Sequence, residues 1–331
     1  MASPTTVVTI FGGSGFIGRY VTQRLAREGW RIRVAVRRPE EGLFVRPYGA
    51  VGQVEPVQAN IRDDASTQAA IRGADVVINC VGILGQSGKQ TFDAVVAEGA
   101  ARIARFAAEE GGQRLVHVSA IGADAGSDSA YARAKAQAEK AVQSSFPDAT
   151  ILRPSVVFGT EDEFFNRFAS MARFSPALPV VGPDTRFQPV YVDDVAAAVE
   201  KAAKGEASPG IYELGGPEAA TFRALMERLL KVIERKRFLM VIPFGIAALQ
   251  GRAFDLLQSL SLGLFTNGIL TADQVALLKR DNVVTDGART FADLGIEPTP
   301  MEAVLEGYLY SYRPHGQYDA ITASAENLRN Q

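Results

Sequence analysis

Short apolar runs alternate with amphipathic stretches along the first half of this 331-residue chain. The apolar runs have the length and the β-branched content of strands, and they are Val7–Phe11, Ile32–Val36, Val54–Val57, Val76–Cys80 and Leu115–Val118. The stretches between them have helical periodicity and are Phe16–Glu28, Ala65–Ile71, Thr91–Glu110 and Ala130–Ser145. Strands that alternate with helices form a parallel sheet covered by helices on both faces. The sequence therefore predicts an α/β fold, a doubly wound parallel Rossmann sheet.

The alternation becomes less regular after Pro154. Three later stretches are candidate helices, at Glu163–Arg173, Asp193–Ala203 and Phe222–Arg235. A Pro/Gly-rich stretch runs over Ser175–Pro189, and a candidate strand over Ile211–Leu214. From Phe238 to Tyr312 we expect mainly helix. We predict a dinucleotide-binding domain over residues 1–155, to which later segments return, and a smaller, mainly helical C-terminal domain over 156–313 that faces a substrate or partner. Residues 314–331 are expected to form a polar tail.

A glycine-rich turn joins the first expected strand to the first expected helix. Its residues are Gly12, Gly13, Ser14, Gly15, Phe16, Ile17 and Gly18, which give the spacing G-x-x-G-x-x-G. Glycine permits a tight turn with positive φ and lets the backbone approach a phosphate. The helix N-terminus then offers unpaired N–H groups to a pyrophosphate. The same residues could form a tight turn without a ligand, but their place after a strand and before a helix favours dinucleotide binding.

The residues at the ends of the next strands suggest which dinucleotide binds. An NAD site usually carries an acid after the second strand, for the ribose 2′-hydroxyl, but here Arg37 and Arg38 follow it. Two guanidinium groups suit a 2′-phosphate, so we predict NADP(H) in preference to NAD(H), although both arginines could simply be solvated. Asn60 is expected to contact the adenine. The backbone near the ribose should come from Cys80, Val81 and Gly82, with Cys80 itself a small buried residue.

Tyr131 and Lys135 are four residues apart on an expected helix, so they share a face. A nearby ammonium lowers the pKa of a phenol, which would make Tyr131 a usable acid or base. Lys135 could also bond the nicotinamide ribose, and Ser119, after the fifth strand, could polarise a carbonyl. These three residues are therefore the candidate catalytic residues, either active or vestigial, and they are candidate cofactor contacts as well.

The bulk composition gives no indication of a nucleic-acid partner, because the net charge is only −2. The single cysteine cannot form an intrachain disulfide, and the two histidines do not belong to a zinc-binding pattern, so we expect no metal. No apolar stretch is long enough for a membrane span. A basic cluster that includes Arg228, Lys231 and Arg235 to Arg237 precedes apolar residues from Phe238. It suits an anionic membrane surface or an acidic partner, or it caps a helix C-terminus ahead of core residues.

The glycine loop, the Ser–Tyr–Lys set and several later segments together resemble the extended or atypical branch of the short-chain dehydrogenase/reductase superfamily. The later segments are Leu152–Pro154, Val190–Val195 and Tyr212–Pro217. The resemblance adds Pro154 to the candidate cofactor contacts. Extended members often carry a proton-relay Asn where this chain has Val96, and this departure puts full catalytic competence in question.

A narrower resemblance is to the NAD(P)H-binding accessory subunit of respiratory complex I and its bacterial relatives. It is carried by Asn79–Leu84, His117–Asp124, Phe158–Ala169, Leu270–Val275 and Asp281–Val284. The resemblance implies a structural NADP(H) and partner subunits of complex I near the junction of the peripheral and membrane arms. It also implies a peripheral location on the cytoplasmic side of a bacterial inner membrane.

Two other functions remain open from the sequence. The chain could be an NADPH-dependent reductase or isomerase of quinone metabolism, since close relatives in this branch are linked to ubiquinone biosynthesis. It could also be a redox-sensing NADP(H) binder that regulates a partner.

Overall fold

The computed structural model describes residues 6–251, 271–314 and 316. Its centre is a seven-stranded parallel sheet with the strand order β11-β6-β5-β4-β1-β2-β3. The strands are β1 (Val7–Phe11), β2 (Arg31–Val36), β3 (Val54–Gln58), β4 (Val76–Asn79), β5 (Arg114–Val118), β6 (Thr150–Pro154) and β11 (Gly210–Leu214). Most of their residues are buried because helices cover both faces of the sheet. The predicted doubly wound parallel fold is confirmed.

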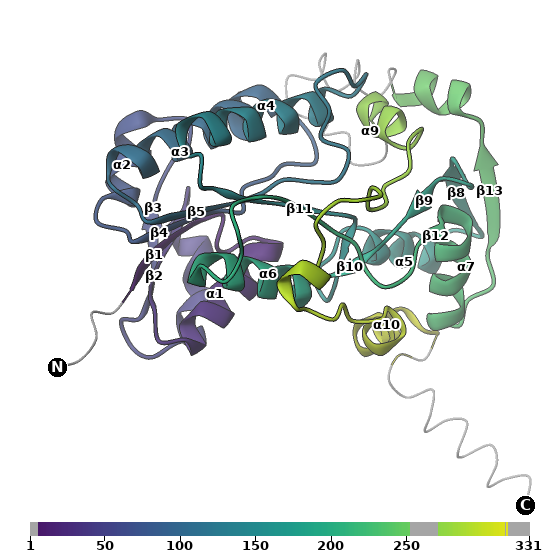
Figure 1. The fold of residues 1–331 in the computed structure, drawn as a ribbon. Coiled ribbons are helices and arrows are strands. Elements are labelled where there is room, and N and C mark those ends of the chain that lie inside the picture. Colours follow the sequence, from purple (N-terminus) through teal and green to yellow (C-terminus); the bar gives the residue numbers. More distant parts are fainter. Residues whose placement is uncertain (1–5, 252–270, 315, 317–331) are drawn as a thin grey trace, which may run out of the picture.

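Two layers of helices enclose the sheet (Figure 1). One layer holds α2 (Asp64–Ile71), α3 (Glu98–Glu109) and α4 (Ala130–Ser145), whose apolar side chains share a core with Phe11 and Ile151. The other layer holds α1 (Phe16–Arg27), the 3-10 segment η1 (Pro39–Tyr48) and α6 (Val192–Lys204). Within this layer, Arg24 of α1 binds Asp193 of α6 through two hydrogen bonds of 2.8 and 2.7 Å. The later elements α6 and β11 thus pack on and pair with the Rossmann sheet.

A smaller set of elements packs beside the carboxyl ends of the strands (Figure 1). It contains β7 (Val157–Phe158), α5 (Phe165–Phe174), β8 (Ala177–Val181), β9 (Arg186–Phe187), β10 (Val190–Tyr191), β12 (Ala220–Thr221), α7 (Phe222–Val232), β13 (Phe238–Ile242), α9 (Ala272–Leu277), the 3-10 turns η3 (Ala292–Leu294) and η4 (Tyr310–Tyr312), and α10 (Glu302–Leu309). Its core is rich in aromatic rings, among them Phe158, Phe165 and Phe222.

The stretch from Phe238 to Tyr312, which we expected to be mainly helix, begins instead with a strand. Phe238–Ile242 forms the strand β13, which pairs in parallel with β8, and β8 lies in the Pro/Gly-rich stretch. The two strands are far apart in the sequence, and their pairing creates a strand that local periodicity does not reveal. The expected polar tail falls almost wholly outside the described residues.

Candidate functional site

The glycine loop forms the tight turn that a dinucleotide site requires. Gly12 has φ +74°, and its N–H donates to the Ala35 oxygen at 3.1 Å. The Gly15 N–H returns to the Gly12 oxygen at 2.9 Å. A Cβ on Gly18 would lie 2.1 Å from the Gly12 oxygen, so only glycine lets α1 pack this closely against the loop. The spacing of the glycines is therefore explained by backbone contacts.

Helix α1 begins at Phe16, with Gly15 as its N-cap and no side chain bonded to its first turn. The opening N–H groups of a helix lack internal partners and carry the positive end of the helix dipole. They lie at the carboxyl end of β1, where ligands of doubly wound sheets bind. Gly13 and Gly15 donate their N–H groups to the Ile10 and Gly12 oxygens, so the backbone donors that could meet a pyrophosphate are those of the first turn of α1.

Three arginines lie close to this loop in the sequence or the structure, and one of them was missed by the sequence analysis. Arg37 is exposed and makes no ion pair with any described residue. Arg38 binds Glu41 at 2.5 Å on the surface. Arg19 directs its guanidinium at the Ser14 and Gly15 oxygens and binds Glu161 at 3.1 Å. Arg19 lies three residues after the start of α1, so one helix turn brings its side chain back to the loop. This spacing could have identified Arg19 as a site residue from the sequence.

The ends of β3 and β4 complete the dinucleotide side of the site. The Asn60 side-chain oxygen accepts from the Arg62 N–H at 3.2 Å. The side-chain oxygen of the residue expected at the adenine is therefore used to stabilise the turn after β3. Cys80 donates its N–H to the Phe11 oxygen at 2.9 Å, which ties β4 to β1. A Cβ on Gly82 would meet nothing within 4 Å, which leaves space beside that backbone.

Tyr131 and Lys135 lie together on α4, as predicted. The Lys135 Nζ is 5.7 Å from the centre of the Tyr131 ring and donates to the Val118 oxygen at 3.2 Å. Burial lowers the pKa of Lys135 to about 8. Burial, and after it the charge of Asp273, raise the pKa of Tyr131 to about 12. The expected lowering of the Tyr131 pKa by the lysine is therefore absent from this structure, because desolvation outweighs it.

Ser119 lies at the end of β5, but its hydroxyl is directed into the protein. It is 4% exposed and donates to Glu139 of α4 at 2.5 Å. Arg153 of β6 binds the same carboxylate at 2.6 and 2.9 Å and reaches Glu213 at 3.2 Å. A serine hydroxyl has only one proton to donate. In this arrangement that proton is used by Glu139, and polarisation of a carbonyl by Ser119 stays a prediction.

Two further residues near the Tyr131–Lys135 pair, His117 and Cys80, have pKa values that burial shifts. His117 of β5 is 1% exposed and contacts Asn79 at 3.1 Å through Nδ1, while its Nε2 has no partner. Burial lowers the pKa of His117 to about 3, so it is neutral and belongs to the core. Burial raises the pKa of the Cys80 thiol to about 12. His117 is thus a core residue of β5, whereas Cys80 follows β4 and is half-buried.

Val96 occupies the position at which extended members often carry Asn. It is 2% exposed and lies in η2 (Asp93–Ala97), a π-helical turn that continues into α3. Such a turn often marks a functional site. Here the turn is present, but the buried side chain of Val96 is apolar and cannot relay a proton.

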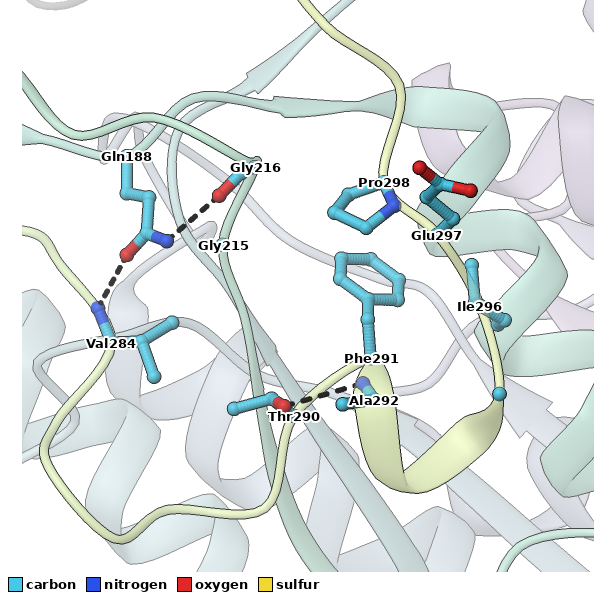
Figure 2. A pocket seen from close by; sticks show the side chains of 11 residues that line it. Gln188, Gly215, Gly216, Val284, Thr290, Phe291, Ala292, Ile296, Glu297 and Pro298 are labelled. Carbon is cyan, nitrogen blue, oxygen red and sulfur yellow. Dashed lines mark hydrogen bonds between the residues drawn. The ribbon is translucent and has the colours of Figure 1, made fainter.

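A separate cleft of about 550 Å³ opens beyond the end of β11 (Figure 2). Figure 2 shows Phe291 and Pro298 on one wall and the Gly215–Gly216 backbone on the other, where Gln188 bridges the Gly216 oxygen and the Val284 N–H. None of the predicted site residues lines this cleft. Among the described residues, no cluster of three or more His, Cys, Asp or Glu side chains could hold a metal.

Comparison with known proteins agrees with this geometry. The parallel sheet with a glycine loop between β1 and α1 is that of a dinucleotide-binding Rossmann domain, and residues 12–198 match the model of a family described as NAD(P)H-binding. The chain belongs to this NAD(P)H-binding family. Within it, the chain also belongs to the family of subunit 9 of the NADH dehydrogenase (ubiquinone) 1 alpha subcomplex. The Arabidopsis thaliana protein of that name is 36% identical over 96% of this chain and 81% of its own length.

The chain is also similar to two enzymes. The ceramide reductase of Caulobacter vibrioides is 35% identical over 58% of this chain and 59% of its own length. The structure of the NADPH-dependent quinone oxidoreductase of Escherichia coli superposes with a TM-score of 0.69, at 20% identity, over 91% of this chain and 98% of that one. This last likeness confirms the fold.

Proposed function

We propose that this protein is an accessory subunit of respiratory complex I that holds NADP(H) as a structural cofactor. The observation that carries the proposal is a contrast within the site. The first turn of α1, which follows the glycine loop and has no side-chain cap, leaves backbone N–H groups for a pyrophosphate, whereas Ser119 and Lys135 donate to protein oxygens. The kinship with the complex I subunit of Arabidopsis thaliana over nearly the whole chain supports the same function.

A bound nucleotide would stabilise the subunit without reacting. A ligand that binds only the folded state adds RT ln(1 + [L]/Kd) to the free energy of unfolding, which is about 2.7 kcal/mol at a hundredfold excess over Kd. Arg37 supports NADP(H) over NAD(H), because its exposed guanidinium has no ion-pair partner among the described residues and follows β2. We propose that Arg37, with Arg38 released from Glu41, binds the 2′-phosphate.

An exposed apolar face on the small domain is the proposed contact surface. Its large side chains are Phe174, Phe238, Met240, Val241, Ile246 and Leu249, which are between 44% and 83% exposed. Lys231 and Lys236 are exposed near it. The rest of the basic cluster makes internal contacts, as a capped helix end would: Arg228 binds Glu218 and Glu302, and Arg235 donates to the Tyr312 oxygen.

An apolar face of this kind, flanked by cations, fits partner subunits or an anionic membrane surface. In the described residues no helix has the length and apolar character needed to cross a bilayer. We therefore propose that the protein is peripheral, on the cytoplasmic side of a bacterial inner membrane, near the junction of the two arms of complex I.

Co-purification tests the proposal. Native membranes are solubilised in mild detergent, complex I is isolated, and nucleotide released from the subunit is identified by mass. We expect the chain to travel with complex I and to release NADP(H). The variant Phe174→Ser should weaken this association, whereas Leu84→Ser, a matched exposed leucine of the Rossmann domain that is 61% exposed, should leave it unchanged. A chain that stays apart from complex I contradicts the proposal.

A second candidate function is an NADPH-dependent reductase or isomerase. It is favoured by Tyr131 and Lys135 on one face of α4 and by the kinship with a ceramide reductase. In this function hydride would pass to a carbonyl while Tyr131 donated a proton. Replacement of Tyr131 by Phe would then abolish turnover with nucleotide still bound. Under the structural function, the same variant assembles and supports respiration like the wild type.

A further inference from the structure

Residues 271–285, which we call the strap, cross the carboxyl edge of the sheet next to the Tyr131–Lys135 pair. The strap begins with α9, whose Thr271 and Gln274 form a reciprocal cap, and then runs between the Rossmann sheet and the small domain (Figure 1). Ligands of open α/β sheets bind outside the carboxyl ends of the strands. The strap therefore occupies the side of the site from which a substrate would approach the nicotinamide.

Asp273 fastens the first end of the strap. Its carboxylate accepts from the Ala130 N–H at 2.6 Å and from the Ser129 hydroxyl at 2.8 Å, at the first turn of α4. A negative charge is favoured at a helix N-terminus, and hydrogen bonds to a carboxylate are stronger than those to a neutral group. The next residue of α4 is Tyr131, so the fastening point adjoins the predicted proton donor.

Polar contacts hold the rest of the strap to three strand ends. The Asn282 side-chain oxygen accepts from the Ser155 hydroxyl at 2.6 Å and from the Val156 N–H at 3.1 Å, just after β6. The Asn282 amide donates to the Ile121 oxygen at 3.3 Å, beyond β5. Thr285 donates its N–H to Glu213 of β11 at 2.8 Å. Apolar packing adds to these contacts, because Val275 of α9 is 1% exposed and packs with Val181 and Ala247, and Leu278 packs against the same cluster. The strap is therefore held by one small apolar cluster near its start and by hydrogen bonds along the rest of its length.

We infer that the strap is a latch that closes the nicotinamide end of the site and slows the exchange of bound dinucleotide, with Asp273 as its principal fastening. The inference rests on the proposed function, because it needs a nucleotide to retain. A closed latch would also keep carbonyl substrates from Tyr131. Hydrogen bonds and one small apolar cluster, separate from the large cores, can open locally without global unfolding, which makes such a segment suited to control exchange.

Nucleotide kinetics on the full-length protein test the inference. NADPH fluorescence follows association, and a chase with excess NADP⁺ follows release. Asp273→Asn keeps the side-chain shape but loses the charge, and we expect both rates to rise about tenfold, because a hydrogen bond to a neutral amide is weaker than one to a carboxylate. Since a latch acts on entry and exit alike, Kd should change much less than either rate. Asp286→Asn, an exposed acid just beyond the strap, is the matched control.

Asn282→Ala gives an independent loosening of the strap should Asp273→Asn fail to fold, and it too should raise both rates. Unchanged rates in both variants, with NADPH bound by the wild type, overturn the latch alone. Release that rises without any change in association also overturns it, because that pattern belongs to a weakened contact. A wild type that binds no NADPH overturns the latch and the proposed function together.

Discussion

The glycine-loop end of the site and its Tyr131–Lys135 end differ in what their polar groups contact. At the glycine loop, the first turn of α1 is left without a side-chain cap. At the other end, the Lys135 ammonium and the Ser119 hydroxyl donate to protein oxygens, and Asp273 caps α4. A site arranged this way has donors ready for a diphosphate but few groups ready for a reacting carbonyl. Nucleotide binding and turnover are thus separable properties of one fold.

The largest expected effect is at the glycine loop. Gly18→Ala would place a Cβ 2.1 Å from the Gly12 oxygen, and only the backbone can move to relieve that contact. We expect the free energy of unfolding to fall by about 4 kcal/mol and nucleotide binding to be lost. Urea denaturation and NADPH titration measure the two effects. Gly85→Ala, where a Cβ meets nothing within 4 Å, is the matched control and should change neither.

The buried ion network at the other end should give the next largest effect. Glu139→Ala removes the acceptor of Ser119 and the main partner of Arg153, which keeps only Glu213. We expect a loss of about 2–3 kcal/mol, because a partly buried cation is left poorly paired. Glu109→Ala breaks an exposed pair with Arg105 and should cost less than about 0.5 kcal/mol. Equal losses in the two variants would show that the network has no structural function.

His117 makes stability depend on pH. Burial lowers its pKa to about 3 in the folded protein, against 6.5 for the ordinary group, so the unfolded chain binds the extra proton first. The contribution of neutral His117 to the free energy of unfolding is complete above pH 6.5 and is lost as the pH falls toward 3. Between pH 6 and 5 we expect about 1 kcal/mol of lost stability from this group. His117→Gln should flatten the slope there, and an identical slope in variant and wild type refutes the assignment.

Gly82→Ala should have the smallest effect on stability and is the sharpest test of the site. Its added Cβ meets nothing within 4 Å in the protein alone, so we expect less than about 0.5 kcal/mol of destabilisation. If the dinucleotide ribose lies there, NADPH affinity should fall by about tenfold, the equivalent of 1.4 kcal/mol. Isothermal titration measures the affinity. Unchanged binding would remove Gly82 from the site and leave the glycine loop as its only backbone contribution.

The sequence predicted the Rossmann half closely because its signals are local. Val7–Phe11 and Ala130–Ser145 form a strand and a helix with the predicted bounds, since a continuous apolar run and a helical period identify them without reference to distant residues. The strand Phe238–Ile242 was missed, because it pairs with residues about sixty positions away and has no alternation of its own.

The backbone turn of the candidate site was predicted from the sequence, but the hydrogen-bond partners of its side chains were not. Glycine spacing reports backbone geometry directly, and the loop was correctly placed between β1 and α1. The partners of Ser119 and the fastening of α4 by Asp273 were not foreseen. Both depend on which side chains meet across the sheet edge, and Asp273 lies 143 residues beyond Ala130, the first residue of α4. The roles of Arg37, Asn60 and Pro154 toward a nucleotide remain predictions.

Before assembly, a newly synthesised chain presents the outer edge of β13 to every other chain in the cell. Within the described residues this strand pairs only with β8, and its sequence Phe-Leu-Met-Val-Ile holds neither charge nor proline. Unprotected edges of this composition recruit further strands, and adjacent cations such as Lys236 and Arg237 counter that tendency only in part. Overproduction of the chain by itself should therefore yield self-associated material.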